Sequence, residues 1–194
     1  MYNRFRNESP LLFNVGIDYN EFYYDGPKEN IIMFPLRTSE SKGAIYILDA
    51  VNKLYTELKN WKLITFGDYP ANKVPGYIEF HYKASNAEIK KMYAKSKIFV
   101  FPSLVEGFPL TVLEAMASRC AVISTNCGGT DEYIVDGENA LFVPIKDSID
   151  IEKKVLTLSS DENLINKLAK NGQITAKKYS YGNMYKQFIK LLIF

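Results

Sequence analysis

Short apolar runs alternate with amphipathic stretches along most of this chain. Six apolar-rich runs predict strands at residues 31–34, 63–66, 77–80, 98–101, 121–124 and 141–143. Stretches with apolar residues every three or four positions predict helices at residues 44–58, 109–118, 148–158, 163–178 and 181–192. Ser85 and Glu88 form a capping box that opens a further helix through residue 93, and a short helix is expected near residues 131–135. The alternation predicts an α/β fold: a Rossmann-like parallel sheet of about six strands with helices on both faces.

Composition and charge narrow the classes of protein that fit. At 194 residues the chain suits one domain with a substantial core. The net charge of +2 argues neither for nor against nucleic acid, but the lysines are scattered rather than clustered, and we expect no nucleic-acid partner. No apolar run reaches transmembrane length, and residues 1–10 do not resemble a signal peptide. Cys120 and Cys127 are the only cysteines, and we expect reduced, buried thiols rather than metal ligands.

The most informative stretch joins the fourth predicted strand to the helix that follows it. Residues 106–108 form the loop, and Pro109 suits the first helical turn, where its missing N–H costs nothing. The start of a helix carries unpaired N–H groups and a partial positive charge, so it favours an anion such as a diphosphate. Glu106 in the loop and Glu114 about one turn inside the helix can accept hydrogen bonds from the hydroxyls of a sugar and a ribose. The stretch therefore indicates a nucleotide-sugar site.

Two cations follow the first predicted strand. Arg37 and Lys42 lie in its carboxyl-terminal loop, and ligands of open α/β sheets bind outside the carboxyl ends of the strands. The alternative is a solvated loop with two ordinary surface cations.

The run Pro-Ser-Leu-Val-Glu-Gly-Phe-Pro-Leu-Thr-Val-Leu-Glu-Ala-Met-Ala, from Pro102 to Ala117, resembles the Glu-x7-Glu signature of the retaining glycosyltransferases of family four, which have the GT-B fold. The likeness extends from about Gly16 to the C-terminus. It implies that the chain is the donor-binding C-terminal half of a two-domain enzyme. Residues 1–30 would be the inter-domain connector and residues 31–194 the nucleotide-sugar-binding domain, with its last helix packing on the missing N-terminal, acceptor-binding domain.

The same resemblance implies a role for each site residue. Arg37 and Lys42 would grip the diphosphate of the donor and neutralise the leaving nucleotide, and Glu106 would lie nearest the transferred sugar. These three are the expected catalytic residues. The expected donor-binding residues are Gly107, Phe108, Pro109, Leu110, Glu114, Gly128, Gly129 and His81. The chain has no Asp-x-Asp motif, which fits a site without metal or cofactor whose substrate is a nucleoside diphosphate-sugar.

Some of these residues have plainer interpretations. Gly128 and Gly129 also suit a tight turn in which Thr130 caps the short helix, and His81, the only histidine, also suits an ordinary surface position. The family pattern has glycine at four positions that are different here: Leu36, Tyr82, Arg119 and Ala140. Arg119 is the most demanding of them, because the end of a helix often needs the left-handed backbone that glycine adopts readily.

Taken with the resemblance, the sequence predicts transfer of a sugar from a nucleoside diphosphate-sugar to an acceptor hydroxyl with retained configuration, in polysaccharide, glycolipid or cell-surface glycan synthesis. The acceptor would be a glycan or a lipid-linked glycan, and the chain alone would bind donor but be largely inactive without the acceptor domain. We expect a cytoplasmic location, with peripheral membrane association left open. The alternatives are a stand-alone subunit that needs a separate acceptor-binding partner, another GT-B reaction such as sugar-nucleotide epimerisation, and a generic α/β ligand-binding domain.

Overall fold

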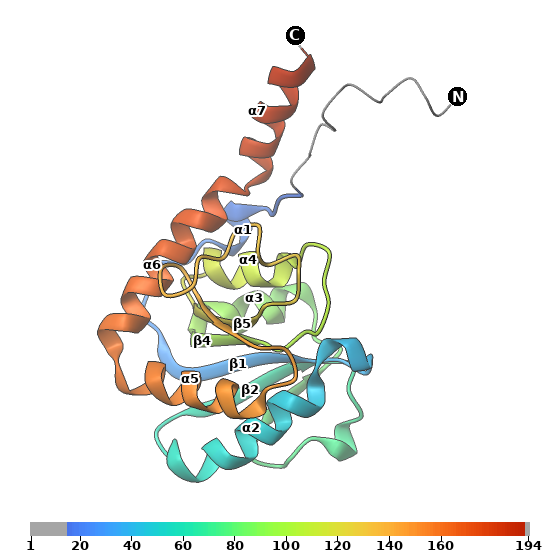
Figure 1. Ribbon diagram of the computed structural model, residues 1–194, viewed down its shortest axis with the longest axis vertical. Coiled ribbons are helices and arrows are strands. Elements are labelled where there is room, and N and C mark those ends of the chain that lie inside the picture. Colours follow the sequence, from blue (N-terminus) through green and yellow to red (C-terminus); the bar gives the residue numbers. More distant parts are fainter. Residues whose placement is uncertain (1–14, 193–194) are drawn as a thin grey trace.

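A six-stranded, fully parallel sheet forms the centre of the molecule in the computed structural model, which describes residues 15–192 and the side chains as far as residue 189 (Figure 1). The strands are β1 (Glu29–Leu36), β2 (Lys62–Gly67), β3 (Glu79–Tyr82), β4 (Ser96–Phe101), β5 (Ala121–Thr125) and β6 (Leu141–Val143). Their order across the sheet is β3-β2-β1-β4-β5-β6, and every neighbouring pair is parallel. The predicted Rossmann-like sheet is confirmed.

Helices cover both faces of this sheet. They are α1 (Tyr19–Phe22), α2 (Ala44–Glu57), α3 (Asn86–Lys95), α4 (Leu110–Ala117), α5 (Ser148–Ser160), α6 (Glu162–Lys178) and α7 (Tyr181–Leu192). One core lies under α2 and α5, and the other lies under α3 and α4 with α1 beside them. Helix α6 contacts β5 as well as α4 and α5, and α7 extends beyond the body of the domain (Figure 1).

The central strand β1 shows why the strands read as continuous apolar runs. Ile31 and Met33 belong to the core on one face, whereas Ile32 and Phe34 belong to the core on the other. Side chains of a strand alternate between the two faces, so a strand with helices on both sides needs an apolar residue at every position.

The local sequence signals predicted the start of α3 correctly and the start of β3 to within two residues. The capping box is present, with the Ser85 N–H donating to Glu88 Oε2 at 2.8 Å and the Glu88 N–H donating to Ser85 Oγ at 3.3 Å. The third strand begins two residues later than predicted, because the Ile78 N–H donates to the Pro75 carbonyl at 3.0 Å and holds the preceding residues in a turn.

The prediction of a short helix near residues 131–135 is wrong. The segment is a series of turns, in which the N–H groups of Tyr133 and Ile134 both donate to the Thr130 carbonyl. The Thr130 hydroxyl does not cap a helix but donates to the Thr125 carbonyl at the end of β5, at 3.2 Å.

Arg119 adopts the left-handed backbone that glycine would favour, with φ of 63° just after α4. The guanidinium pairs with Asp25, so the side chain has a partner even though its backbone is unfavourable. The fold therefore tolerates this departure from the family pattern locally.

Residues 15–30 lie against the domain. The N–H of Ile17 donates to the Tyr179 carbonyl and the N–H of Tyr181 donates to the Ile17 carbonyl, both at 2.9 Å. The Lys28 ammonium donates to the carbonyls of Tyr93 and Ser118, near the ends of α3 and α4. Burial lowers the pKa of Lys28. The assignment of residues 1–30 as an inter-domain connector stays a prediction, and residues 1–14 lie outside the described part of the chain.

Candidate functional site

The candidate site lies where the strand order reverses direction, between β1 and β4. From this point the chain order proceeds from β1 through β2 to β3 toward one edge of the sheet and from β4 through β5 to β6 toward the other, so the loops after β1 and β4 diverge and leave a crevice. The loop after β1 carries Arg37 and Lys42, and the loop after β4 carries Glu106. The sheet topology thus brings together two loops that are distant in sequence.

An ion pair joins these loops directly. The Lys42 ammonium lies 2.7 Å from Glu106 Oε1, and the two side chains are 37% and 16% exposed. Ser103, which is 1% exposed, donates its hydroxyl to the same oxygen at 2.8 Å. Glu106 is therefore held by one buried hydroxyl and one partly exposed cation.

The start of α4 faces the same crevice. Pro109 is the N-cap residue and no side chain caps the helix, so the first-turn N–H groups are available to a ligand. A pocket of about 440 Å³ opens here, and its charged and polar lining residues are Arg37, Ser39, Lys42, Asp68, Ser103, Glu106 and Thr111. Pro109 and Leu110 line it as well, and together these groups favour an anion beside hydroxyl groups.

A second pocket, of about 390 Å³, adjoins the first and contains Glu114. Arg37, Leu110 and Thr111 line both pockets, so one continuous depression holds Arg37, Lys42 and both glutamates. The Arg37 guanidinium carbon lies 5.9 Å from the centre of the ring of Phe66, which lines the second pocket, and the two form a cation–π contact.

Burial raises the pKa of Glu114 to about 7. The hydroxyl of the fully buried Tyr93 lies 3.4 Å from Glu114 Oε2 and opposes this shift by stabilising the carboxylate, whereas the nearby charge of Glu21 adds to it. Glu114 thus changes its charge near neutral pH, in a pocket that also contains Asp18 and Asn86.

The glycine pair supports the loop that carries Glu106. The Glu106 N–H donates to the Cys127 carbonyl at 3.0 Å, and the Gly129 N–H donates to the Glu106 carbonyl at 2.9 Å. A Cβ atom on Gly129 would lie 2.1 Å from the Gly107 carbonyl oxygen, so only glycine permits this approach. Gly128 and Gly129 are not among the residues that line the two pockets. Gly128 forms a β-bridge with Glu106, so the glycine pair contacts the loop rather than the pocket.

Residues 107–109 are backed by aromatic rings. Phe108 lines the first pocket, and its ring lies 5.4 Å from that of Tyr133 and 5.7 Å from that of Tyr179. The Tyr133 hydroxyl donates to the Pro109 carbonyl at 3.0 Å. These contacts fix the direction in which the chain enters α4.

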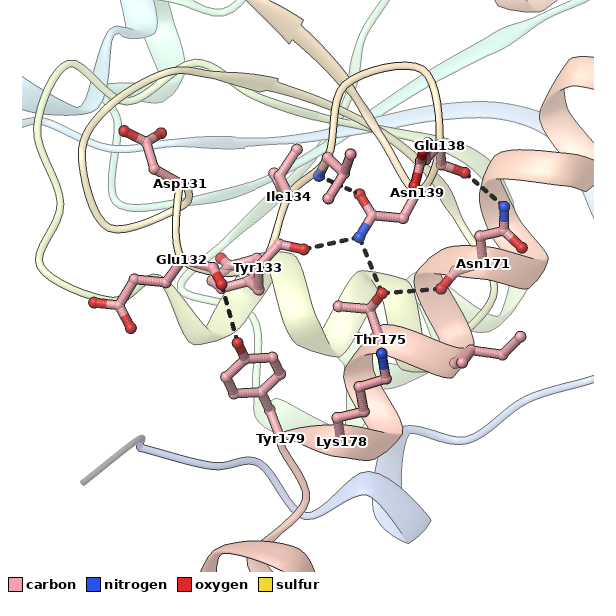
Figure 2. A pocket seen from close by; sticks show the side chains of 12 residues that line it. Asp131, Glu132, Tyr133, Ile134, Glu138, Asn139, Asn171, Thr175, Lys178 and Tyr179 are labelled. Atoms are coloured by element: carbon pink, nitrogen blue, oxygen red, sulfur yellow. Dashed lines mark hydrogen bonds between the residues drawn. The ribbon is translucent and has the colours of Figure 1, made fainter. Parts of the chain in front are cut away.

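Residues of α6 form hydrogen bonds with the segment that carries Glu138 and Asn139, as Figure 2 shows. Asn139 donates to the Tyr133 carbonyl at 2.8 Å and to the Thr175 hydroxyl at 2.9 Å, and it accepts from the Val135 N–H at 2.8 Å. The Tyr179 hydroxyl donates to the Glu132 carbonyl at 3.1 Å. The residues of this network line a separate, open pocket of about 470 Å³ and brace the segment from the glycine pair to β6.

His81 is not brought together with the other predicted residues. Its ring lies 2.8 Å from Glu79 Oε1 and lines a different pocket of about 330 Å³, beside the first residues of β1, β2 and β3. This pocket is at the opposite end of these strands from the crevice, so the geometry favours the plainer interpretation of His81 as a surface residue.

Sequence reasoning missed several residues of the site: Ser103, Thr111, Tyr93, Phe66, Asp68 and Asn86. Ser103 had the clearest signal, because it follows a predicted strand end and precedes Glu106 by three residues. Within residues 15–192, the structure shows no group of three or more His, Cys, Asp or Glu side chains that could hold a metal ion. The same residues include no helix of the length and apolarity needed to cross a membrane.

Comparison with known proteins adds a family match over most of the chain. The family model described as "Glycosyl transferases group 1" matches residues 23–175. An N,N'-diacetylbacillosaminyl-diphospho-undecaprenol alpha-1,3-N-acetylgalactosaminyltransferase from Campylobacter jejuni is 34% identical, over 95% of this chain and 54% of its own length. An alpha-1,4-N-acetyl-D-galactosaminyltransferase of the same organism is 27% identical, over 98% of this chain and 56% of its own. The chain thus spans about half the length of these curated relatives.

A solved structure agrees with the fold. The C-terminal domain of a glycosyl transferase group 1 family protein from Francisella tularensis superposes with a TM-score of 0.76 at 29% identity. The match covers 86% of this chain and 100% of that one.

Proposed function

The chain belongs to the group 1 glycosyl transferases and has the fold of a GT-B C-terminal domain, and from this premise we propose that it binds the donor of a retaining, metal-independent enzyme. The donor is a nucleoside diphosphate-sugar, and the enzyme transfers its sugar to an acceptor hydroxyl. One observation carries the proposal: Arg37, Lys42, Glu106 and Glu114 meet in two adjoining pockets at the uncapped start of α4.

The geometry supports a division of labour within the site. The diphosphate would lie at the start of α4, where the helix N–H groups, Arg37 and Lys42 stabilise the negative charge that grows on the leaving group. Such stabilisation is the part that a metal ion plays in other enzymes, so Arg37 and Lys42 remove the need for one. The sugar would face Glu106, and the ribose would face Glu114 in the second pocket.

The two Campylobacter jejuni relatives suggest the substrate class. Both names state transfer of an N-acetylgalactosaminyl group to a saccharide linked to undecaprenol diphosphate. We propose an N-acetylhexosamine donor and a lipid-linked glycan acceptor for the complete enzyme, which would bring it to the cytoplasmic surface of a membrane.

Thermal unfolding of the chain with UDP, GDP, ADP or dTDP, each with and without EDTA, tests the donor site. Ligand at 100 times its Kd stabilises a protein by about 2.7 kcal/mol, which corresponds to a rise in Tm on the order of 5–10 °C at this size. One nucleotide should give this rise regardless of EDTA, and Arg37→Ala and Glu114→Ala should abolish it. Lys59→Ala, an exposed position beyond the far end of α2, is the matched control and should keep it. A rise only with a divalent metal would contradict the metal-independent mechanism.

Transfer itself is a separate test. We expect the purified chain to bind donor and to transfer little or no sugar, because the acceptor side is proposed to come from another half of the enzyme. Robust transfer by this chain would contradict that expectation. In the complete enzyme, NMR of the product should show the anomeric configuration of the donor.

A further inference from the structure

Glu106 Oε1 accepts two hydrogen bonds from donors of very different exposure. The Ser103 hydroxyl, at 2.8 Å, belongs to a residue that is 1% exposed, and its carbonyl also accepts from the Thr125 hydroxyl. The Lys42 ammonium, at 2.7 Å, belongs to a side chain that is 37% exposed on the loop after β1. If one partner leaves Glu106, it is therefore Lys42, while Ser103 keeps the carboxylate in place.

The ion pair conflicts with the role proposed for Lys42 at the diphosphate. An ammonium engaged with a carboxylate is already neutralised, and a diphosphate that draws Lys42 away must offset the lost pair. It would leave Glu106, whose side chain is only 16% exposed, with one hydrogen bond fewer on Oε1. A sugar hydroxyl on the donor can replace that bond, whereas a nucleoside diphosphate without sugar cannot.

We infer that Lys42 is exchanged between Glu106 and the donor diphosphate, and that this exchange makes the site discriminate between nucleoside diphosphate-sugar and nucleoside diphosphate. The substrate draws Lys42 away and gives Glu106 a hydroxyl in return. The product draws Lys42 away and gives nothing, so it binds less tightly and leaves as the Lys42–Glu106 pair forms again. The inference rests on the proposed function, because it needs a donor diphosphate at the start of α4.

The test is a double-mutant cycle on nucleotide affinity, measured by calorimetry. The probes are UDP, GDP, ADP and dTDP, together with the sugar nucleotide of each one that binds. Glu106→Gln removes the charge that competes for Lys42, so the diphosphate should bind about fivefold more tightly, the effect of a partly exposed ion pair. The sugar nucleotide should gain nothing, because the stronger acceptor for its hydroxyl is lost. In a Lys42→Ala background, Glu106→Gln should change diphosphate affinity less than twofold.

Glu40→Gln is the matched control for a general loss of negative charge. Glu40 is exposed on the same loop as Lys42 and is outside the lining of both pockets. It should leave the ratio of the two affinities unchanged. Equal gains from Glu40→Gln, or a gain that persists without Lys42, would overturn the exchange while leaving the donor site intact. Absence of binding for all four nucleotides by the unmodified chain would instead overturn the proposed function, and the exchange with it.

Discussion

Substitution of Gly129 by alanine tests whether the glycine turn positions the Glu106 loop. A Cβ atom at this position would lie 2.1 Å from the Gly107 carbonyl oxygen, 2.4 Å from its carbonyl carbon and 2.8 Å from the Phe108 nitrogen. All three atoms are backbone, so no rotamer change can relieve the overlap. The two loops must move apart, and the hydrogen bond from the Gly129 N–H to the Glu106 carbonyl at 2.9 Å is lost or weakened.

The size of the effect follows from these contacts. Overpacking in a closely fitted region costs about 1–3 kcal/mol, and a backbone hydrogen bond contributes about 1 kcal/mol. We therefore expect the free energy of unfolding of Gly129→Ala to fall by about 2–4 kcal/mol. For a domain of this size the corresponding fall in Tm is on the order of 4–16 °C.

Urea denaturation followed by circular dichroism measures this change. Gly76→Ala is the matched control, since a Cβ there would meet no atom within 4 Å, and its unfolding midpoint should stay close to that of the unmodified chain. The folded Gly129→Ala variant should also bind nucleotide-sugar more weakly, because its Glu106 loop has moved. Equal midpoints for the two alanine variants would refute the close approach on which the reasoning depends.

Three further predictions concern stability. Folding raises the pKa of Glu114 from 4.5 to about 7, so the folded state binds its proton more tightly. The difference in free energy of unfolding between the unmodified chain and Glu114→Gln should therefore favour the unmodified chain most below pH 4.5 and should fall as the pH rises to 7. A difference that stays flat or rises with pH would contradict this. Arg119→Gly should be about 1 kcal/mol more stable than Arg119→Ala in urea, because both lose the pair with Asp25 and only alanine keeps a Cβ at φ of 63°; equal stability would count against backbone strain. Asn139→Ala should lose about 3 kcal/mol through three hydrogen bonds, against about 1 kcal/mol or less for the single bond of Asn171→Ala, and similar losses would mean that the two additional bonds of Asn139 contribute little to stability.

The sheet was predictable because its strands carry the signal at every residue. A strand such as β1, with Ile32 and Phe34 in one core and Ile31 and Met33 in the other, is apolar throughout and cannot be mistaken for a surface segment. The turns at residues 131–135 were not predictable in the same way. Thr130 followed by two acidic residues looks like the start of a helix, but the Glu132 carbonyl accepts from the hydroxyl of Tyr179, which is 47 residues later at the end of α6, and no local pattern predicts that contact.

The candidate site was predictable in its charged residues and not in its supporting ones. Arg37, Lys42 and Glu106 stand at strand ends, and parallel strands place those ends at one edge of the sheet. Ser103 had a local signal in its position three residues before Glu106, whereas Tyr93 contacts Glu114 from 21 residues away, which no local pattern predicts. The sequence places His81 in a strand but does not show which end of the sheet its side chain lines, and the structure places it in the pocket beside the first residues of β1 and β2, away from the crevice.

The two buried cysteines lie in the same core, at opposite ends of β5. Cys120 is 0% exposed and begins the approach to β5, whereas Cys127 is 4% exposed and accepts the Glu106 N–H through its carbonyl. A maleimide can alkylate either thiol only after the surrounding chain opens, and the alkylation rate reports the free energy of that opening. One mass-spectrometric time course would thus yield two protection factors from an unmodified protein. Cys127 would report opening of the segment that binds the Glu106 loop, and Cys120 would report opening of the core between α4 and β5.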